Sequence, residues 1–180
     1  MQSKYTPFQI ILEILSAAVV LVGILFFLLS WQSIPEQIPT HYDALGNPDA
    51  WNTKNMVIIL FVIQALAYIS ITLLSFFPKL WNRPGNLSES SLSVYHSVTR
   101  TLLLEMKTLI VLAFGYLTVC TAKAIRLNLF IMLFFIVVII ISVARYFIRL
   151  MKISLADARR EQKNECGDDE TISSKFMKNT

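Results

Sequence analysis

The fold of this chain is decided by one stretch, Leu129–Ile141, with the sequence LFIMLFFIVVIII, in which no side chain is polar. It forms the centre of an apolar run from Leu127 to Ile148. A helix crosses a bilayer with about 20 apolar residues, so this run is long enough to span one. Three more runs of that length are Phe8–Leu29, Met56–Phe77 and Leu102–Ala122. None alternates polar and apolar residues as barrel strands do, so the sequence predicts an all-α integral membrane bundle of four transmembrane helices.

The composition agrees with lipid as the solvent. Of 180 residues, 55% are hydrophobic and only 16% are charged, whereas an average soluble domain has roughly 25% charged residues. The net charge is +4, but the basic residues stand mainly at the ends of the apolar runs, where they orient helices in a membrane. The expected partner is therefore the lipid bilayer and not a nucleic acid.

Lys and Arg near the ends of the runs predict the orientation, because cytoplasmic flanks carry more of them. With both termini in the cytoplasm, nine basic residues lie on the inner side and three on the outer side. The inner residues are Lys4, Lys79, Arg83, Arg100, Arg149, Lys152, Arg159, Arg160 and Lys163. The outer residues are Lys54, Lys123 and Arg126. The sequence thus predicts a multi-pass protein of the cell membrane with cytoplasmic N- and C-termini.

The runs divide the chain into four parts. Residues 1–77 hold the first two helices and the loop between them, 78–101 form a cytoplasmic loop, 102–148 a hairpin of two transmembrane helices, and 149–180 a cytoplasmic tail. Within the cytoplasmic loop, Ser88 is a candidate N-cap from which a helix restarts toward the third run. The tail begins basic and amphipathic, which predicts a surface-lying continuation of the fourth helix, and it is expected to become disordered where it turns polar and acidic.

The loop between the first two helices, predicted to be extracytoplasmic, is the most informative segment. Pro35 and Pro39 exclude a regular helix there and favour an extended backbone. The segment Asp43–Asp49 contains Gly46 and an Asn-Pro pair, which together predict a compact turn. We therefore expect a structured loop rather than a flexible linker.

This loop carries a pattern of spaced prolines, a histidine, a glycine, an aspartate and a lysine. Its residues are Pro35, Ile38, Pro39, His41, Gly46, Asp49 and Lys54. The pattern resembles the short domain of unknown function found in bacterial membrane proteins related to SdpI, a bacteriocin-immunity and signalling protein. The resemblance is best over Val22–Phe76, and it implies a ligand-binding or structural role for these residues. The chain departs from the family in carrying Asp43 where asparagine is more frequent, and in having fewer spans than full-length SdpI proteins.

Three loop residues, His41, Asp43 and Asp49, offer the imidazole and carboxylate donors that bind divalent cations. Their spacing matches no zinc motif and no EF-hand. The alternative is structural, with His41 bonded to the backbone of the turn, Asp49 capping the second helix and Gly46 in a left-handed conformation. No Gly-x-Ser-x-Gly, His-Glu-x-x-His or phosphate-binding glycine loop occurs, so we expect neither an enzyme nor a cofactor.

Four charged residues within the apolar runs form a second candidate site: Glu13, Glu105, Lys107 and Arg145. A charge in mid-membrane costs about 2.5–3.5 kcal/mol on insertion scales, so each is expected to find a partner. Glu105 and Lys107 are two residues apart and point to different faces of a helix, which leaves Glu13 to pair with Lys107 or Arg145. Such a pair is either a structural clamp between helices or part of a proton or solute relay. Gln64, in the second run, is expected to hydrogen-bond a neighbouring helix.

Taken with the resemblance, these observations favour a non-enzymatic bacterial membrane protein that binds a ligand or toxin peptide and acts in immunity or signalling. One alternative is a small transporter or permease subunit built around the charged residues. Another is a metal-dependent extracytoplasmic hydrolase built around the loop. The expected partners besides lipid are a peptide toxin, a cytoplasmic regulator or further copies of the chain.

Overall fold

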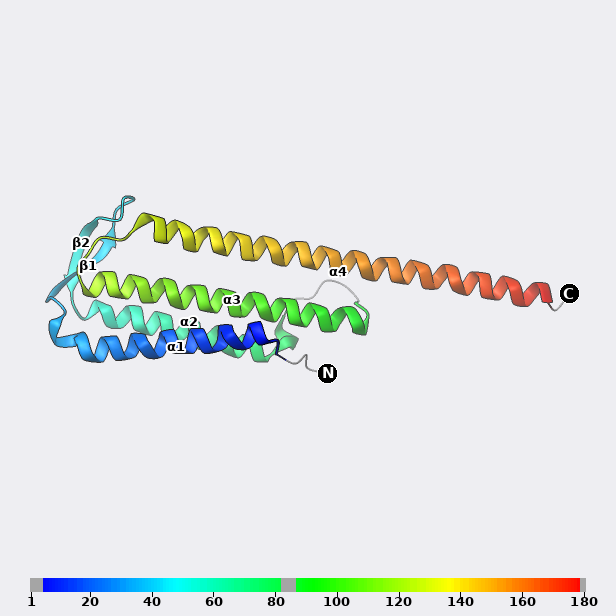
Figure 1. The fold of residues 1–180 in the computed structure, drawn as a ribbon, viewed down its shortest axis with the longest axis horizontal. Coiled ribbons are helices and arrows are strands. Elements are labelled where there is room, and N and C mark those ends of the chain that lie inside the picture. Colours follow the sequence, from blue (N-terminus) through cyan, green and yellow to red (C-terminus); the bar gives the residue numbers. More distant parts are fainter. Residues whose placement is uncertain (1–4, 82–86, 179–180) are drawn as a thin grey trace.

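The computed structural model describes residues 5–81 and 87–178. For residues 161 and 164–178 it describes the backbone alone. Four long helices and a two-stranded hairpin make up most of it (Figure 1). In chain order, the elements are α1 (Pro7–Ser30), the 3-10 turn η1 (Trp31–Ser33), β1 (Gln37–Tyr42), β2 (Pro48–Thr53), α2 (Met56–Phe76), the 3-10 turn η2 (Pro78–Leu80), α3 (Glu89–Ala122) and α4 (Leu129–Lys178).

Each of the four long helices contains a segment long and apolar enough to cross a membrane. The ends of α1 and α2 lie within one residue of the predicted ends, because the apolar runs stop sharply there. Helix α3 begins earlier than its apolar run and takes up the second half of the predicted loop 78–101. Its N-cap is Ser88, as predicted, and the Ser88 hydroxyl accepts a hydrogen bond from the Ser91 N–H.

Helix α4 continues without interruption to Lys178, so the predicted continuation of the fourth helix into the tail is confirmed and the prediction of disorder after it is wrong. The first part of the tail, up to Lys163, is rich in Ala, Arg, Glu, Gln and Lys, all good helix formers, and no proline interrupts the polar and acidic part that follows. Charge alone therefore did not prevent a helix. In Figure 1 the second half of α4 projects beyond the other three helices as a single rod.

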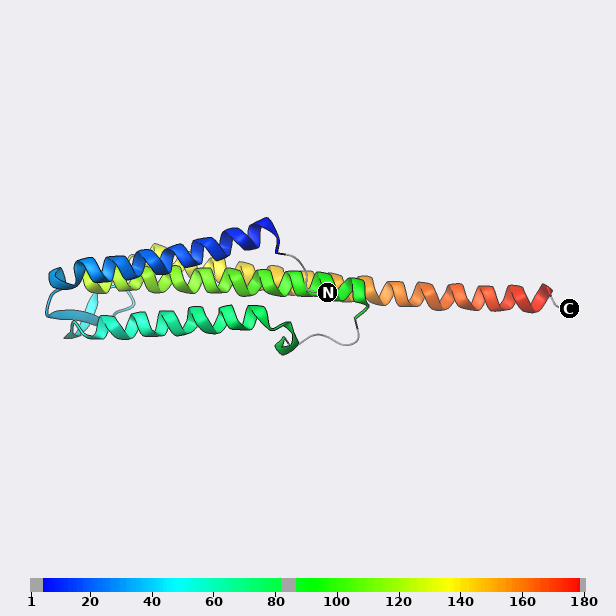
Figure 2. The same cartoon turned by 90° about the horizontal axis from the view of Figure 1, so that it is seen from below.

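Helix α3 is the centre of the bundle. Helices α1, α2 and α4 each pack chiefly against α3 (Figures 1 and 2). The hairpin and the connection from Lys123 to Asn128 lie at one end of the bundle, which we call the hairpin end. The N-terminus of α1, η2 and the start of α3 lie at the other end, which we call the open end.

The segment between α1 and α2 adds a small antiparallel sheet to the otherwise all-α fold. Strand β1 pairs with β2 from Gln37 opposite Thr53 to Tyr42 opposite Pro48, and the register shifts around His41. The predicted extended backbone and compact turn are both present. The turn is closed by hydrogen bonds from the Asp43 N–H to the Asn47 carbonyl, 2.9 Å, and from the Gly46 N–H to the Asp43 carbonyl, 2.9 Å.

An apolar core fixes the base of the hairpin to the helices. Ile34 and Ile38 are buried with Val57 of α2 and Ala122 of α3. Aromatic side chains from α1, α2 and η1 surround them, with the rings of Phe27 and Phe61 4.9 Å apart. Ile38 of the predicted loop pattern is therefore a core residue, because its side chain leaves the sheet toward the helix ends.

At the open end, α4 is tied to the start of α3 by one carboxylate. Asp157 is almost fully buried and accepts hydrogen bonds from the Ser88 N–H at 3.0 Å, from the Ser88 hydroxyl and from the Ser91 hydroxyl. Arg160 of α4 adds a bond to the Ser90 hydroxyl at 3.0 Å. A carboxylate at the N-terminus of a helix also interacts favourably with the helix dipole. This contact sets the position of α4 relative to α3.

Candidate functional site

The most unusual feature inside the bundle is Lys107 of α3, whose side chain is completely buried. Its ammonium group contacts the Glu13 carboxylate of α1 at 2.5 Å and the Thr72 hydroxyl of α2 at 3.2 Å. It also lies 4.8 Å from the centre of the Tyr68 ring, a cation–π distance. We call these four residues the Lys107 centre. Because Lys107 belongs to α3, the centre connects α3 to both α1 and α2.

Polar residues recur every three or four positions along the helices that meet here. In α1 they are Gln9, Glu13 and Ser16, and in α2 they are Gln64, Tyr68, Thr72 and Ser75. Residues at this spacing share one face of a helix. In both helices that face is turned toward α3, where Gln9, Ser16, Gln64 and Ser75 are all buried. Tyr68 and Thr72 were not predicted as site residues, and this helical spacing is the signal in the sequence that points to them.

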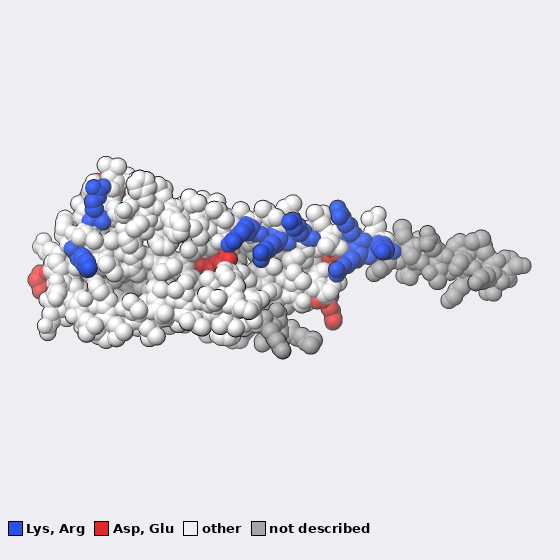
Figure 3. All heavy atoms as spheres, in the orientation of Figure 1, with Lys and Arg blue, Asp and Glu red and all other residues white. Residues whose placement is uncertain are grey.

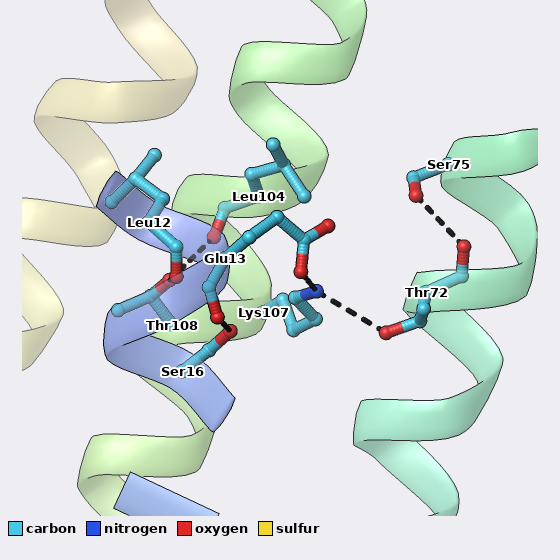
Figure 4. A network of polar contacts seen from close by, with 8 residues as sticks. All are labelled: Leu12, Glu13, Ser16, Thr72, Ser75, Leu104, Lys107 and Thr108. Atoms are coloured by element: carbon cyan, nitrogen blue, oxygen red, sulfur yellow. Dashed lines mark hydrogen bonds and ion pairs between the residues drawn. The ribbon is translucent and has the colours of Figure 1, made fainter. Parts of the chain in front are cut away.

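Short-range hydrogen bonds satisfy the hydroxyl groups beside the Lys107 centre (Figure 4). The Ser16 hydroxyl donates to the Glu13 carbonyl at 3.0 Å, and the Ser75 hydroxyl donates to the Thr72 carbonyl at 2.7 Å. Thr108 donates to the Leu104 carbonyl, 2.8 Å, within α3. Each of these hydroxyl groups donates its proton to a backbone carbonyl of its own helix, and Thr108 also lies 3.3 Å from the Leu12 carbonyl of α1, so these groups have no free proton to donate to the Glu13 carboxylate.

One polar atom of the centre is left over. Glu13 Oε1 is buried and has no hydrogen-bond partner among the described residues, while the other oxygen of the same carboxylate is bound to Lys107. Breaking a buried ion pair by removing one partner is costly, because the other charge stays desolvated. The arrangement fits a clamp between helices, and its free carboxylate oxygen is also able to accept a proton or a hydrogen-bond donor.

The four charges predicted as one cluster form two separate pairs. Lys107 pairs with Glu13, whereas Arg145 of α4 donates to both carboxylate oxygens of Glu105 at 3.0 Å and to the Ser142 hydroxyl at 3.2 Å. The side chain of Arg145 is 55% exposed, in contrast to the buried Lys107. Because Glu105 and Lys107 stand on different faces of α3, each pair joins α3 to a different neighbour.

Gln9 also links α1 to α3, a role that was not predicted from the sequence. Its side-chain oxygen accepts from the Thr6 N–H, and the Thr6 hydroxyl accepts from the Gln9 N–H, which completes a capping box at the start of α1. Its side-chain nitrogen donates to the Ser97 carbonyl at 3.0 Å and to the Thr101 hydroxyl at 2.9 Å. Gln64 behaves similarly at mid-bundle, donating to the Val111 carbonyl of α3 at 3.3 Å.

The tip of the hairpin is docked onto the connection between α3 and α4. The Leu127 N–H donates to the Gly46 carbonyl at 2.8 Å, and Arg126 donates to the Leu45 carbonyl at 3.2 Å. Gly46 has a φ of +80°, so the prediction of a left-handed glycine is confirmed. A Cβ atom at this position would lie 2.4 Å from the Leu127 carbonyl oxygen. Glycine is therefore required twice, by the backbone angle and by the contact.

Asp43 holds the turn in the role predicted for His41. Its carboxylate accepts hydrogen bonds from the N–H groups of Leu45, 2.9 Å, and Asn47, 2.8 Å, and from the Asn47 side chain at 3.1 Å. These bonds from Asn47, backbone first, hold the pKa of Asp43 below its usual value. All the hydrogen bonds of this carboxylate are thus made within the turn.

His41 pairs with Asp49 across the hairpin at 2.6 Å, on an exposed surface. Asp49 lies in β2 and does not cap α2; the residue at that N-cap position is Asn55. The interpretation of Asp49 as a helix cap is wrong, because six residues of strand and turn separate it from α2. Of the predicted cation ligands His41, Asp43 and Asp49, the structure brings two together, and the described residues contain no group of three such donors.

The remaining residues of the loop pattern fix the hairpin to its surroundings. Pro39 and Ile38 are buried, while Pro35 lies on the surface. The Lys54 ammonium group pairs with the Glu36 carboxylate at 2.7 Å and lies 5.3 Å from the centre of the Trp31 ring. The spacing of the pattern thus corresponds to a small folded unit with an exposed outer face.

One family match covers part of this unit. Residues 18–65 match the family described as a domain of unknown function (DUF1648). The matched segment runs from the middle of α1 through the hairpin into the first half of α2. Comparisons with curated proteins and with solved structures found no significant match.

Proposed function

We propose that this chain is a multi-pass membrane protein in which all four long helices span the bilayer. The supporting observation is an inside-out distribution of side chains. Leu29 and Phe130 are 83% and 80% exposed, whereas Gln9 and Lys107 are 0% exposed. Exposing this much apolar surface to water is very unfavourable, whereas lipid tails solvate it and favour polar contacts between helices.

The proposed orientation places the hairpin end outside and the open end in the cytoplasm. In the sequence, the flanks predicted to be cytoplasmic carry nine Lys and Arg residues, and those predicted to be outside carry three. Cytoplasmic flanks carry the larger number. Lys54 at the hairpin end is moreover engaged by Glu36 and Trp31, so the exposed basic charge is concentrated at the open end and along α4.

In this orientation the hairpin is the outer recognition element of a non-enzymatic protein. All residues of β2 after Pro48 are exposed, and the large side chains of Leu45 and Trp51 are 63% and 51% exposed. The hydrogen bond between Leu127 and Gly46 ties the hairpin to the connection between α3 and α4. An exposed strand that carries a tryptophan suits an extended peptide.

The resemblance to the SdpI-related family supplies the class of peptide. We propose that the hairpin binds a membrane-active toxin peptide and that the chain acts in immunity or in signalling the presence of the toxin. The match of residues 18–65 to a domain of unknown function is consistent with a membrane family. The observation that carries the proposal is the docked, outward-facing hairpin.

The test is a protection assay in cells. Cells that express the chain are challenged with membrane-active toxin peptides, beside cells with an empty vector. We expect protection, loss of protection with Trp51→Ala, and retention with Asn52→Ala, which changes an equally exposed neighbour on the same strand. If wild-type cells are protected and both variants protect equally, recognition does not use this face of the hairpin. If wild-type cells are not protected, the immunity role is contradicted.

A second candidate function is a relay of protons or solute through the bundle. It is favoured by one observation, the buried and unpaired Glu13 Oε1 beside Lys107, whose partners were sought among the described residues. Glu13→Gln tests it, because an amide keeps the hydrogen bonding but cannot release a proton. A relay predicts a variant that is stable and inactive in a proton-flux assay on vesicles. A clamp predicts that flux is absent from wild-type vesicles as well.

A further inference from the structure

Two hollows lie where α1 and α4 flank α3, and we call the line that joins them the groove. At the open end this line begins at a hollow of about 300 Å³, which we call the basic hollow. Thr6 and Phe8 of α1, Glu105 of α3, and Arg145 and Arg149 of α4 line it.

Toward the hairpin end the groove widens again, into a hollow of about 440 Å³ that we call the apolar hollow. Its walls are almost entirely apolar. They include Val19 and Gly23 of α1, Leu112 and Gly115 of α3, and Phe135 of α4. Gly23 and Gly115 leave space in this wall, since a Cβ added at either position would make only ordinary contacts, at 3.5 and 3.7 Å.

The two hollows lie along one line. On α3 the lining residues Leu102, Glu105, Leu112 and Tyr116 follow the spacing of a single helical face. On α4, Phe135 and Ser142 lie seven residues apart, again on one face. Since α3 and α4 are antiparallel, these stripes run from one hollow to the other along one side of the bundle, whose lining changes from apolar to basic toward the open end.

The basic hollow carries an excess of positive charge. Two guanidinium groups, Arg145 and Arg149, face one carboxylate, Glu105, which is already bound to Arg145. Among the described residues, Arg149 has no hydrogen bond or ion pair. Figure 3 shows Lys and Arg gathered along α4 from this level outward, with few acidic side chains beside them. A phosphate group would neutralise the excess charge, and Arg is well suited to bind it.

We propose that this groove binds an anionic phospholipid of the inner leaflet. The headgroup phosphate lies in the basic hollow against Arg149, and one acyl chain follows the groove to the apolar hollow. At about 1.5 Å per residue, Gly115 lies about 15 Å from Glu105 along α3. That is the depth of one leaflet in a hydrocarbon core of about 30 Å. The proposal rests on the proposed membrane insertion, with the open end in the cytoplasm.

The test uses the purified full-length chain in a neutral detergent, with the melting temperature followed as lipid is added. Dioleoyl phosphatidylglycerol should raise the melting temperature more than dioleoyl phosphatidylcholine, which has the same tails. Inorganic phosphate should have no effect, and short-chain dihexanoyl phosphatidylglycerol should act only weakly. Arg149→Gln should weaken the apparent affinity for phosphatidylglycerol about five-fold, the effect of one basic residue at a membrane surface.

The matched control is Lys152→Gln, which removes an exposed charge from the same helix outside the hollow. Because Lys152 does not line the hollow and its exposed charge is screened by salt, the variant should change the apparent affinity by less than about two-fold. Equal responses to the two dioleoyl lipids, or equal effects of the two variants, would overturn the proposal. A full response to inorganic phosphate would make the hollow an ion site instead of a lipid site. Native mass spectrometry of the wild-type chain, counting retained phosphatidylglycerol, gives an answer that needs no variant to fold.

Cell fractionation tests the premise of membrane insertion separately from the proposed lipid site. A chain that is not recovered with membranes contradicts membrane insertion itself. A chain that is recovered with membranes but shows no preference for the anionic lipid contradicts only the groove site.

Discussion

The Lys107 centre and the hairpin both join separate parts of the chain, but they do so with different groups. At the Lys107 centre the junction is made by side chains, with a fully buried ammonium group held by a carboxylate, a hydroxyl and an aromatic ring. At the hairpin the junction to the α3–α4 connection is made mostly by backbone groups, through Gly46 and Leu127. The ion pair on the hairpin, His41 with Asp49, is exposed.

This difference between a buried and an exposed ion pair shows where charged side chains contribute to stability. A buried pair has lost its hydration, so removing one partner leaves the other without compensation. An exposed pair keeps most of its hydration and contributes little. The same kinds of side chain are therefore expected to be critical in the bundle and dispensable on the hairpin, where glycine geometry matters more.

The largest effect is expected from Lys107→Met. It leaves the Glu13 carboxylate buried without its cation, and we expect a loss of about 3–5 kcal/mol in the free energy of unfolding. The measurement is thermal or denaturant unfolding of the purified protein in detergent. The double variant Glu13→Gln with Lys107→Met should recover part of the loss, since it removes both charges. Strictly additive losses would show that the two side chains are not coupled.

Gly46→Val should have the next largest effect, and it should be local. Valine is strained at a φ of +80° and its Cβ would clash with the Leu127 carbonyl oxygen. We expect a cost of about 2 kcal/mol or more, seen as faster hydrogen exchange of the Leu127 amide, while the Lys107 centre stays intact. Ala44→Val, at an exposed neighbouring position of the same turn, is the control. Unchanged exchange at Leu127 in the glycine variant would contradict docking through this contact.

His41→Ala should change stability by less than about 1 kcal/mol, because the His41–Asp49 pair is exposed. The comparison is made in the same unfolding assay as for Lys107→Met, at neutral pH and without added metal. A loss as large as that of the lysine variant would show that exposure does not distinguish the two regions. If added Zn²⁺ raises the stability of the wild type but not that of His41→Ala, the predicted cation site would be supported.

The smallest effect concerns the pH dependence of the turn. Hydrogen bonds lower the pKa of Asp43 below its ordinary value of 3.8, so the stability that this group provides is fully present above that value. It is lost as the pH falls through the lower pKa of the folded state. The melting temperatures of the wild type and Asp43→Asn should therefore differ at about pH 6 and converge as the pH falls to about 3 or below. A difference that does not change with pH would contradict this role of the carboxylate.

The sequence was sufficient to locate the helices, because a helix that crosses a bilayer needs a run of about 20 apolar residues, and such runs can be read directly from the sequence. It was also sufficient for the left-handed Gly46 and the Ser88 cap, since both are local features. The pairing of the loop as a hairpin was not predicted, because the strands are short and their side chains do not alternate cleanly between polar and apolar.

The contacts between distant residues were harder to predict. Whether Glu13 meets Lys107 or Arg145 depends on the rotation of each helix about its axis, which the apolar runs do not specify. The pairing of Asp157 with Ser88 depends on α4 continuing as a helix well past its apolar block. The face of α1 that carries Gln9, Glu13 and Ser16 was the missing clue, since polar residues at helical spacing mark the side turned toward other helices.

The sidedness of the two ends of the bundle provides the most direct test of the proposed topology. Single cysteines are introduced at the exposed positions Thr40 in β1 and Ser93 in α3, in a full-length chain whose Cys120 and Cys166 are replaced by serine. Intact cells are then treated with a membrane-impermeant maleimide. We expect Thr40→Cys to be labelled in intact cells and Ser93→Cys only after lysis. Labelling of Ser93→Cys in intact cells, or of Thr40→Cys only after lysis, would contradict this topology.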